Sequence, residues 1–144
     1  MKGFHLSLEG QVLNEWIDYN DHMNIEFHSH IFVRATEILI GKLGINAASV
    51  AAGEPTLVAT RQHIKYRREL LQGDQWQVWS GLAYVSKASI TLSHRLTAKD
   101  VIRAVCDIQM ISFCPIARQP APMAEERMNQ GMGFVVPGLV DIFA

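Results

Sequence analysis

The sequence predicts an α+β domain in which an antiparallel, five-stranded sheet wraps around one long central helix. Residues 24–42 carry apolar side chains with a helical period, and residues 56–116 hold four consecutive stretches rich in β-branched and aromatic residues. An extended segment before the helix supplies the fifth strand. With 144 residues, of which 49% are hydrophobic, the chain has the size and composition of one domain with its own core.

The first extended segment covers residues 4–16. Its apolar side chains alternate loosely, from Phe4, Leu6 and Leu8 to Val12, with Gly10 between the two halves. Because glycine inside a strand pattern often marks an extra residue or a bend, we expect a strand that is interrupted by a bulge or a bend at Gly10.

The central helix is predicted from its polar residues as much as from its apolar ones. Glu26, His30, Arg34 and Glu37 recur at spacings of four, four and three, and nearly all other side chains are apolar. Such a narrow polar stripe predicts a helix that protein covers on most sides. Glycines at positions 41 and 44 then give the signal for its end.

Four strands follow the helix and can pair as an antiparallel meander that curls around it. Several prolines after residue 114 exclude a further regular strand. We therefore expect a domain at residues 1–122 and a tail at residues 123–144 that packs on the domain or frays.

The charge balance and the cysteines limit the class of protein. Thirteen Lys and Arg face fourteen Asp and Glu, a net charge of -1, which predicts neither a nucleic-acid nor a membrane partner. No stretch resembles a signal peptide or approaches the roughly 20 apolar residues of a membrane span. Cys106 and Cys114 lie about 26 Å apart along one predicted strand, too far for a disulfide. We expect a cytoplasmic protein with free thiols.

The most informative stretch is the acidic turn before the helix, EWIDYNDHMN, at residues 15–24. A helix N-terminus offers unpaired N–H groups and the positive end of a dipole, so it can stabilise a developing oxyanion. Asn24 is expected to cap the helix. Asp18 has two interpretations, a catalytic carboxylate or a simple Asx turn. If Asp21 lies beside Asp18, repulsion would raise one of the two carboxyl pKa values.

This turn resembles the motif of the hotdog-fold acyl-CoA thioesterases, in the group typified by 4-hydroxybenzoyl-CoA thioesterase. The family pattern is Asp, two residues, Gly, His, an aliphatic residue and Asn, with an aromatic residue, Phe and Ala further along the helix. The matching residues here are Asp18, His22, Met23, Asn24, Phe32 and Ala35, and the later stretch HIKYRRELLQGDQWQV resembles the family's second-strand signature. The likeness covers roughly residues 8–122, and DYNDHM with ATEILI is most similar to the branch linked to carnitine and betaine breakdown, whose acyl groups are cationic. Asp21 stands where the family has Gly, and His28 where it has an aromatic residue.

The resemblance implies an acyl-CoA thioesterase that hydrolyses a small or medium acyl-CoA to free acid and CoA, as a homodimer or homotetramer with the ligand at the subunit interface. It needs no cofactor, since coenzyme A is part of the substrate. Asp18 would be the catalytic nucleophile or general base, and His22, which matches the family's histidine, would orient the loop or polarise the site. A hydrogen-bonded structural histidine is the alternative for His22. The other implied site residues are the helix N-terminal amides of Asn24, Ile25, Glu26 and Phe27 for the oxyanion, and Tyr19, His28 and Phe32 for the acyl pocket.

One stretch carries a possible coenzyme A site. Strand parity in RQHIKYRRE places Arg61, His63, Lys65 and Arg67 on one face, and this positive strip, with Arg118, could bind the phosphates of coenzyme A. A solvated strand face is the alternative.

A metal site and a non-catalytic binding function are the alternatives to this interpretation. His28 and His30 are two residues apart and point in different directions on a helix, so we expect no metal site. A non-catalytic acyl-CoA or acyl-carrier binding protein is the rival function. Asp18 argues against it, and Asp21 in place of Gly keeps it open.

Overall fold

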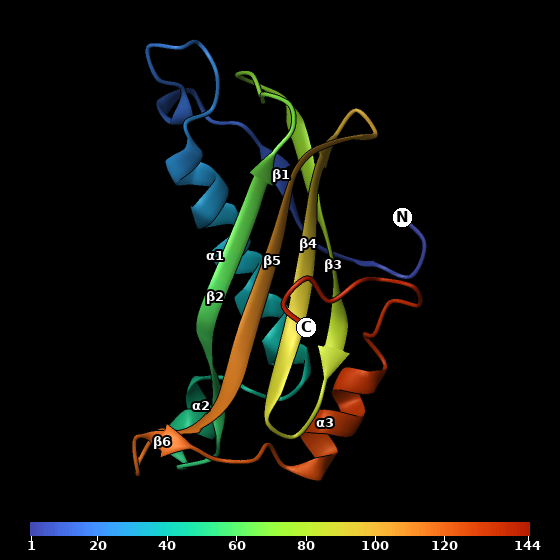
Figure 1. Ribbon diagram of the computed structural model, residues 1–144. Coiled ribbons are helices and arrows are strands. Elements are labelled where there is room, and N and C mark those ends of the chain that lie inside the picture. The colour runs from blue at the N-terminus through green and yellow to red at the C-terminus, as the bar shows by residue number, and fades with distance from the viewer.

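A computed structural model describes residues 1–144. Its elements follow in the order β1 (His5–Gln11), a 3-10 turn (Asn14–Trp16), α1 (Ile25–Lys42), α2 (Ala47–Ala51), β2 (Thr56–Tyr66), β3 (Gln75–Val85), β4 (Ser89–Ala98), β5 (Val101–Cys114), β6 (Gln119–Pro120) and α3 (Glu125–Met132). Figure 1 shows α1 lying behind a long curled sheet. The predicted class, one sheet wrapped around one long helix, is confirmed.

The sheet is antiparallel throughout, with the strand order β1-β3-β4-β5-β2 and the short β6 paired to β5. β1 and β2 are therefore the edge strands. The predicted meander of four consecutive strands is confirmed for β3, β4 and β5 and wrong for β2, which pairs with β5 because β1 occupies the free edge of β3. β2 runs alongside β5 and ends near the start of α1 in Figure 1, so the end of one edge strand and the N-terminus of the central helix lie at the same end of the molecule.

α1 begins at its predicted cap, since the side chain of Asn24 accepts a hydrogen bond from the Glu26 amide at 2.9 Å. The predicted polar stripe is exposed, and Ile31, Phe32, Ala35 and Leu39 on the opposite side are buried. Ile25 and Val33 are 60% and 52% exposed. The sheet therefore covers less of the helix than the apolar composition predicts.

A buried polar network joins α1 to the sheet. His94 of β4 is fully buried, and its Nδ1 and Nε2 lie 2.6 Å from Ser80 Oγ and 2.9 Å from Thr36 Oγ1. Thr36 donates its only hydroxyl proton to the Phe32 carbonyl at 2.8 Å. The proton between Thr36 and His94 must then come from His94 Nε2, which leaves Nδ1 to accept from Ser80.

The bulge in β1 lies between Leu6 and Leu8, so the prediction of a bulge at Gly10 is wrong. Gly10 meets a different constraint, because a Cβ there would lie 2.6 Å from a ring carbon of Trp76. A side chain at this position would displace the buried indole.

The last residues of the chain form a helix and an extended segment against the sheet. α3 was not predicted from the sequence. After it, the Leu82 amide donates to the Phe134 carbonyl at 2.8 Å and the Val136 amide to the Leu82 carbonyl at 2.9 Å. The end of the chain then passes in front of the sheet, on the face opposite α1 (Figure 1), and Phe143 stacks under the Arg61 guanidinium at 5.4 Å.

None of the helices combines the length and the apolar character that crossing a membrane requires.

Candidate active site at the N-terminus of the central helix

The acidic turn is a tight loop closed by backbone bonds. The Asp21 amide donates to the Asp18 carbonyl at 3.0 Å, and Ile17 and Met23 pair across the turn as an isolated bridge. Asp21 has a φ of 61°, in the left-handed region. Glycine adopts this conformation without strain and Asp tolerates it better than most residues, so the turn keeps its shape although Gly is replaced.

The Asp18 carboxylate accepts two hydrogen bonds. Its Oδ1 accepts from the Asn20 amide at 2.8 Å, and its Oδ2 accepts from Asn24 Nδ2 at 2.7 Å. The bond from Asn20, then the bond from Asn24, and to a lesser degree the nearby His22, hold the pKa of Asp18 below its usual 3.8. The expectation that repulsion raises this pKa is therefore wrong for Asp18.

The Asx-turn interpretation of Asp18 is confirmed, and its catalytic role stays a prediction. Asp18 makes the Asx turn with Asn20, and through Asn24 it is fixed to the first turn of α1. A carboxylate has about four lone-pair positions, so two accepted bonds leave room for a reaction partner.

The predicted oxyanion donors reduce to one free amide. The amides of Asn24, Glu26 and Phe27 already donate to Trp16 O, Asn24 Oδ1 and Asn24 O at 2.9, 2.9 and 3.1 Å. The amide of Ile25 has no acceptor within the chain. It lies at the positive end of the helix dipole, so Ile25 N–H is the donor that this turn leaves for a ligand.

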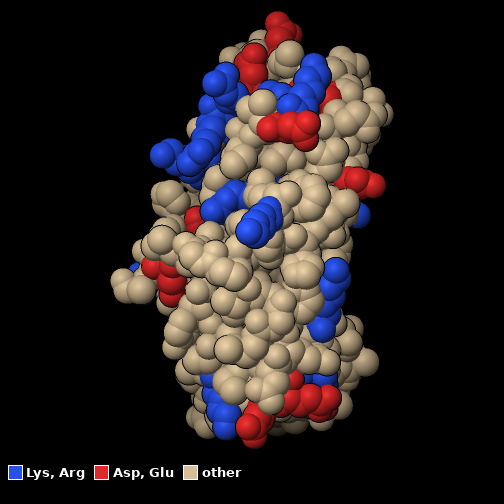
Figure 2. Space-filling model, turned by 90° about the vertical axis from the view of Figure 1, so that its right-hand side faces the viewer, with Lys and Arg blue, Asp and Glu red and all other residues tan.

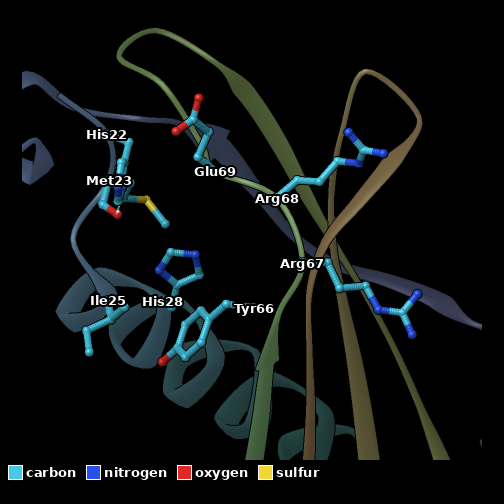
Figure 3. A pocket seen from close by; sticks show the side chains of 8 residues that line it. All are labelled: His22, Met23, Ile25, His28, Tyr66, Arg67, Arg68 and Glu69. Carbon is cyan, nitrogen blue, oxygen red and sulfur yellow. Dashed lines mark hydrogen bonds between the residues drawn. The ribbon is translucent and has the colours of Figure 1, made fainter. Parts of the chain in front are cut away.

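A pocket of about 220 Å³ opens beside this amide. It is lined by His22, Met23, Ile25, His28, Tyr66, Arg67, Arg68 and Glu69 (Figure 3). The first four come from the acidic turn and the start of α1, and the others from the end of β2 and the segment after it. The meeting of these two regions at one end of the sheet creates the pocket.

Two histidines face the pocket in different ways. His28 is only 4% exposed and packs edge-on against the Tyr66 ring at 5.0 Å. Burial lowers the pKa of His28 below 6.5, so its imidazole is neutral near pH 7. His22 is half-buried, with Nδ1 3.3 Å from the Met23 carbonyl.

The segment after β2 is held by a neighbouring arginine. The amides of Arg67 and Arg68 donate to the Arg103 carbonyl at 2.8 and 3.0 Å, and Arg103 Nη1 donates to the Glu69 carbonyl at 3.0 Å. Figure 3 shows the side chains of Arg67 and Arg68 pointing away from His28. Their guanidinium groups therefore lie outside the pocket's inner end. Figure 2 shows Lys and Arg side chains gathered along the upper left of the molecule, with several Asp and Glu side chains nearby.

Three predicted site residues lie elsewhere than expected. Phe32 is completely buried and stacks on His94 at 5.9 Å, so it belongs to the core and does not line the pocket. Tyr19 is 93% exposed and does not line the pocket. Asp18 is not a lining residue either; its carboxylate is bonded to Asn24, which precedes the lining residue Ile25.

The predicted coenzyme A residues are separated. Arg61, His63 and Lys65 are exposed along the edge strand β2, and only Arg67 reaches the pocket. Tyr66, which lines the pocket, pairs with Ala104 near the start of β5, whereas Arg118 follows Cys114 at the end of β5. At the spacing of a strand, Ala104 and Cys114 are about 33 Å apart. A single chain therefore does not bring Arg118 to the pocket, and its guanidinium instead stacks on Phe113 at 5.2 Å.

Sequence reasoning missed four lining residues, Met23, Tyr66, Arg68 and Glu69. Strand parity placed Tyr66 on the face opposite the positive strip, and that face is the one turned toward α1. The face on which Tyr66 lies could therefore be predicted from the sequence, but its contact with the start of α1 could not. Nowhere do three His, Cys, Asp or Glu side chains lie together in a way that could hold a metal ion.

Comparisons with known proteins found relatives in sequence and in fold. A curated relative, betainyl-CoA thioesterase of Pseudomonas aeruginosa, is 27% identical over 88 residues, which are 61% of this chain and only 55% of the relative. SAV2348 of Staphylococcus aureus, solved in complex with CoA, has a TM-score of 0.84 and 21% identity, with 91% of this chain and 84% of that chain covered. Slr0204, a 1,4-dihydroxy-2-naphthoyl-CoA thioesterase of Synechocystis, has a TM-score of 0.75 and 13% identity, with 88% and 95% covered. At these identities the two solved structures show the fold alone.

The family itself is shown by a match along most of the sequence. The model of the thioesterase-like superfamily matches residues 12–131, which include the acidic turn, α1 and the strands β2 to β5. The predicted resemblance is confirmed, and the chain belongs to the thioesterase-like superfamily.

Proposed function

We propose that the protein is an acyl-CoA thioesterase that hydrolyses a small or medium acyl-CoA thioester to free acid and CoA at the N-terminus of α1. One arrangement carries this proposal. The carboxylate of Asp18 is bonded to Asn24, which caps α1, and the next residue, Ile25, presents a free amide to a pocket.

The chemistry needs only these groups and water. Attack on the thioester carbonyl carbon places negative charge on its oxygen, which the Ile25 amide and the helix dipole stabilise. If the Asp18 carboxylate attacks, a mixed anhydride forms as the C–S bond breaks, and coenzyme A leaves as the thiolate. Water then hydrolyses the anhydride, which gives the free acid, restores the Asp18 carboxylate and supplies the proton that converts the thiolate to the thiol. No cofactor besides the substrate is required.

The low pKa of Asp18 favours one of the two roles. A carboxylate with a pKa below 3.8 is ionised at neutral pH and is a weak base, so it is better suited to direct attack than to deprotonating water. We propose that Asp18 acts as the nucleophile and that His22, at the rim of the pocket, orients the turn. The general-base mechanism remains the alternative.

The coenzyme A part of the bound substrate would extend out of the pocket past the end of β2. The guanidinium groups of Arg67 and Arg68 lie outside the inner end of the pocket, where they can bind phosphates by charge-assisted hydrogen bonds (Figure 3). Arg61, His63 and Lys65 continue the positive strip along β2. The CoA complex of the structurally similar SAV2348 supports this class of substrate.

A second subunit would complete the site. β2 is an edge strand of eleven residues, and Ile25 and Tyr66 expose apolar surface near its end. An unpaired edge beside exposed apolar side chains favours pairing with another copy. We propose a homodimer or homotetramer in the cytoplasm, where Cys106 and Cys114 stay free thiols.

The test is thiol release from a panel of short aliphatic, aromatic and betainyl thioesters of coenzyme A. Asp18→Asn should reduce kcat/KM by at least about a hundredfold, since a carboxylate that attacks or moves a proton contributes at least that much. Asp21→Asn, in the same turn but exposed, is the matched control and should stay within about threefold. Equal rates for Asp18→Asn and wild type would exclude the proposed role.

The rival is a protein that binds acyl-CoA without hydrolysing it. It is favoured by the two hydrogen bonds that already occupy Asp18 and by the absence of Asp18 from the pocket lining. Binding of the panel at micromolar concentration without any thiol release by wild type would select the rival.

A further inference from the structure

His28 has an unused hydrogen-bond acceptor. Its Nδ1 lies 3.4 Å from the Asn24 carbonyl, and because a carbonyl oxygen only accepts, Nδ1 carries the proton. The neutral imidazole then has its lone pair on Nε2, for which the chain provides no donor. Figure 3 shows the ring between Met23 and Tyr66 with its free edge turned toward the pocket.

The residues nearest to His28 Nε2 are mostly apolar. His28 is 4% exposed, Met23 is 1% exposed, and Ile25 and the Tyr66 ring complete an apolar wall around it. The charged side chains of the pocket lie farther out, since Arg67, Arg68 and Glu69 point away from the imidazole in Figure 3. Burial keeps the ring uncharged at neutral pH. Nε2 itself is not enclosed by protein atoms but is open to the pocket, where a ligand hydroxyl can take the place of water.

We propose that His28 Nε2 selects the acyl group by accepting a hydrogen bond from its hydroxyl, so that the preferred substrates are small hydroxyacyl thioesters. The inference rests on the proposed thioesterase function and names its substrate class. The pocket volume of about 220 Å³ limits the acyl group to a small one. A betainyl group has a quaternary nitrogen without N–H, so it cannot donate to His28, and this chain should differ in preference from its curated relative.

The test compares acyl-CoA pairs that differ by one hydroxyl: lactoyl with propionyl, 3-hydroxybutyryl with butyryl, and 4-hydroxybenzoyl with benzoyl. Wild type should favour the hydroxylated member of at least one pair by at least about tenfold in kcat/KM, because the deoxy analogue leaves Nε2 unpaired. His28→Phe should remove or invert that preference. His28→Gln, whose amide oxygen also accepts, should keep part of it.

His30→Gln is the matched control, because His30 is exposed on the polar side of the same helix, and it should keep the wild-type ratio. Ratios within twofold for every pair, or a preference that survives in His28→Phe, would overturn the inference. Thermal unfolding of each variant checks that it is folded. If His28→Phe does not fold, the partial loss of preference expected for His28→Gln is the test.

Failure of the proposed function has a different signature. If wild type hydrolyses none of these thioesters, the same pairs are compared by calorimetric binding. Tighter binding of a hydroxylated member, lost in His28→Phe, would support the selector although the enzyme proposal fails. Equal affinities, or no binding of either member, would overturn it. Nitrogen NMR gives a further check, since the account requires a protonated Nδ1 and a bare Nε2 in His28.

Discussion

His94 and His28 are both buried histidines, yet the structure prepares them for opposite purposes. His94 has a partner on each ring nitrogen, Ser80 and Thr36, and no exposed surface. His28 has one long bond to a backbone carbonyl and a second nitrogen that faces a pocket. Burial lowers both pKa values, so charge does not separate them. What separates them is an unused hydrogen-bonding site, which is available for a ligand only in His28.

The largest predicted effect is on stability and concerns His94. His94→Leu removes two buried hydrogen bonds, to Ser80 and Thr36, and should lower the free energy of unfolding by about 2 kcal/mol. The two hydroxyls keep one partner each, Ser7 Oγ and the Phe32 carbonyl. Urea unfolding of wild type, His94→Leu and His28→Phe measures the contrast, and His28→Phe should lose less. Hydrolysis by folded His94→Leu should stay within about threefold of wild type. A collapse of its activity without loss of stability would place His94 in the site and break the comparison.

The next effect is the pH dependence of stability. Burial lowers the pKa of His94 from 6.5 to about 3, so between these values the unfolded chain binds a proton that the folded chain does not. Stability should therefore fall as the pH drops from 6.5 toward 3, by up to about 1.4 kcal/mol per pH unit from this residue. The slope should be smaller in His94→Leu. Identical slopes in the two proteins would contradict the assignment.

Asn24→Ala changes the N-terminus of α1 beside the pocket. It should lower the free energy of unfolding by about 1 kcal/mol through loss of the helix cap. It also removes one of the hydrogen bonds that lower the pKa of Asp18, so that pKa should rise toward 3.8. Asp18 stabilises the fold above its unfolded pKa, and that contribution disappears as the pH falls through the folded value. Carbon NMR titration of the Asp18 carboxyl in both proteins follows the shift, and an unchanged pKa would mean that Asn24 does not hold this carboxylate.

The smallest effects concern the arginines. Arg68→Ala, at the mouth of the pocket, should raise KM for an acyl-CoA by up to about fivefold, the scale of an exposed charge contact. Arg118→Ala should change KM by less than twofold, because its chain position lies at the far end of the sheet. A larger effect from Arg118 would mean that a second subunit carries it to the site.

The fold could be predicted because it depends on patterns that repeat along the chain. The polar stripe of α1 and the alternation of the strands each report which side of an element is buried. The strand order could not be predicted from these patterns, because β2 pairs with the distant β5 and β1 takes the place beside β3. α3 escaped prediction because its residues are mostly polar, and its placement depends on contacts with β3.

The site was predictable only where it is local. Asn24 as cap and Asp18 as turn residue are fixed by neighbours a few positions away. Phe32 was assigned to the pocket from the family pattern, but which side of α1 meets His94 depends on how the helix packs on the sheet. Tyr66 and Arg68 enter the pocket because β2 ends beside α1, a relation between residues some forty positions apart that no local pattern contains.

The proposed acyl site is tested most directly by a crystal structure with a ketone analogue of an acyl-CoA, in which a methylene group separates the carbonyl carbon from sulfur and prevents hydrolysis. We expect the carbonyl oxygen about 3 Å from the Ile25 amide and the carbonyl carbon within reach of the Asp18 carboxylate. The acyl group should lie between Met23, His28 and Tyr66. An acyl group bound anywhere else, or a carbonyl that makes no contact with Ile25, would contradict the proposed site.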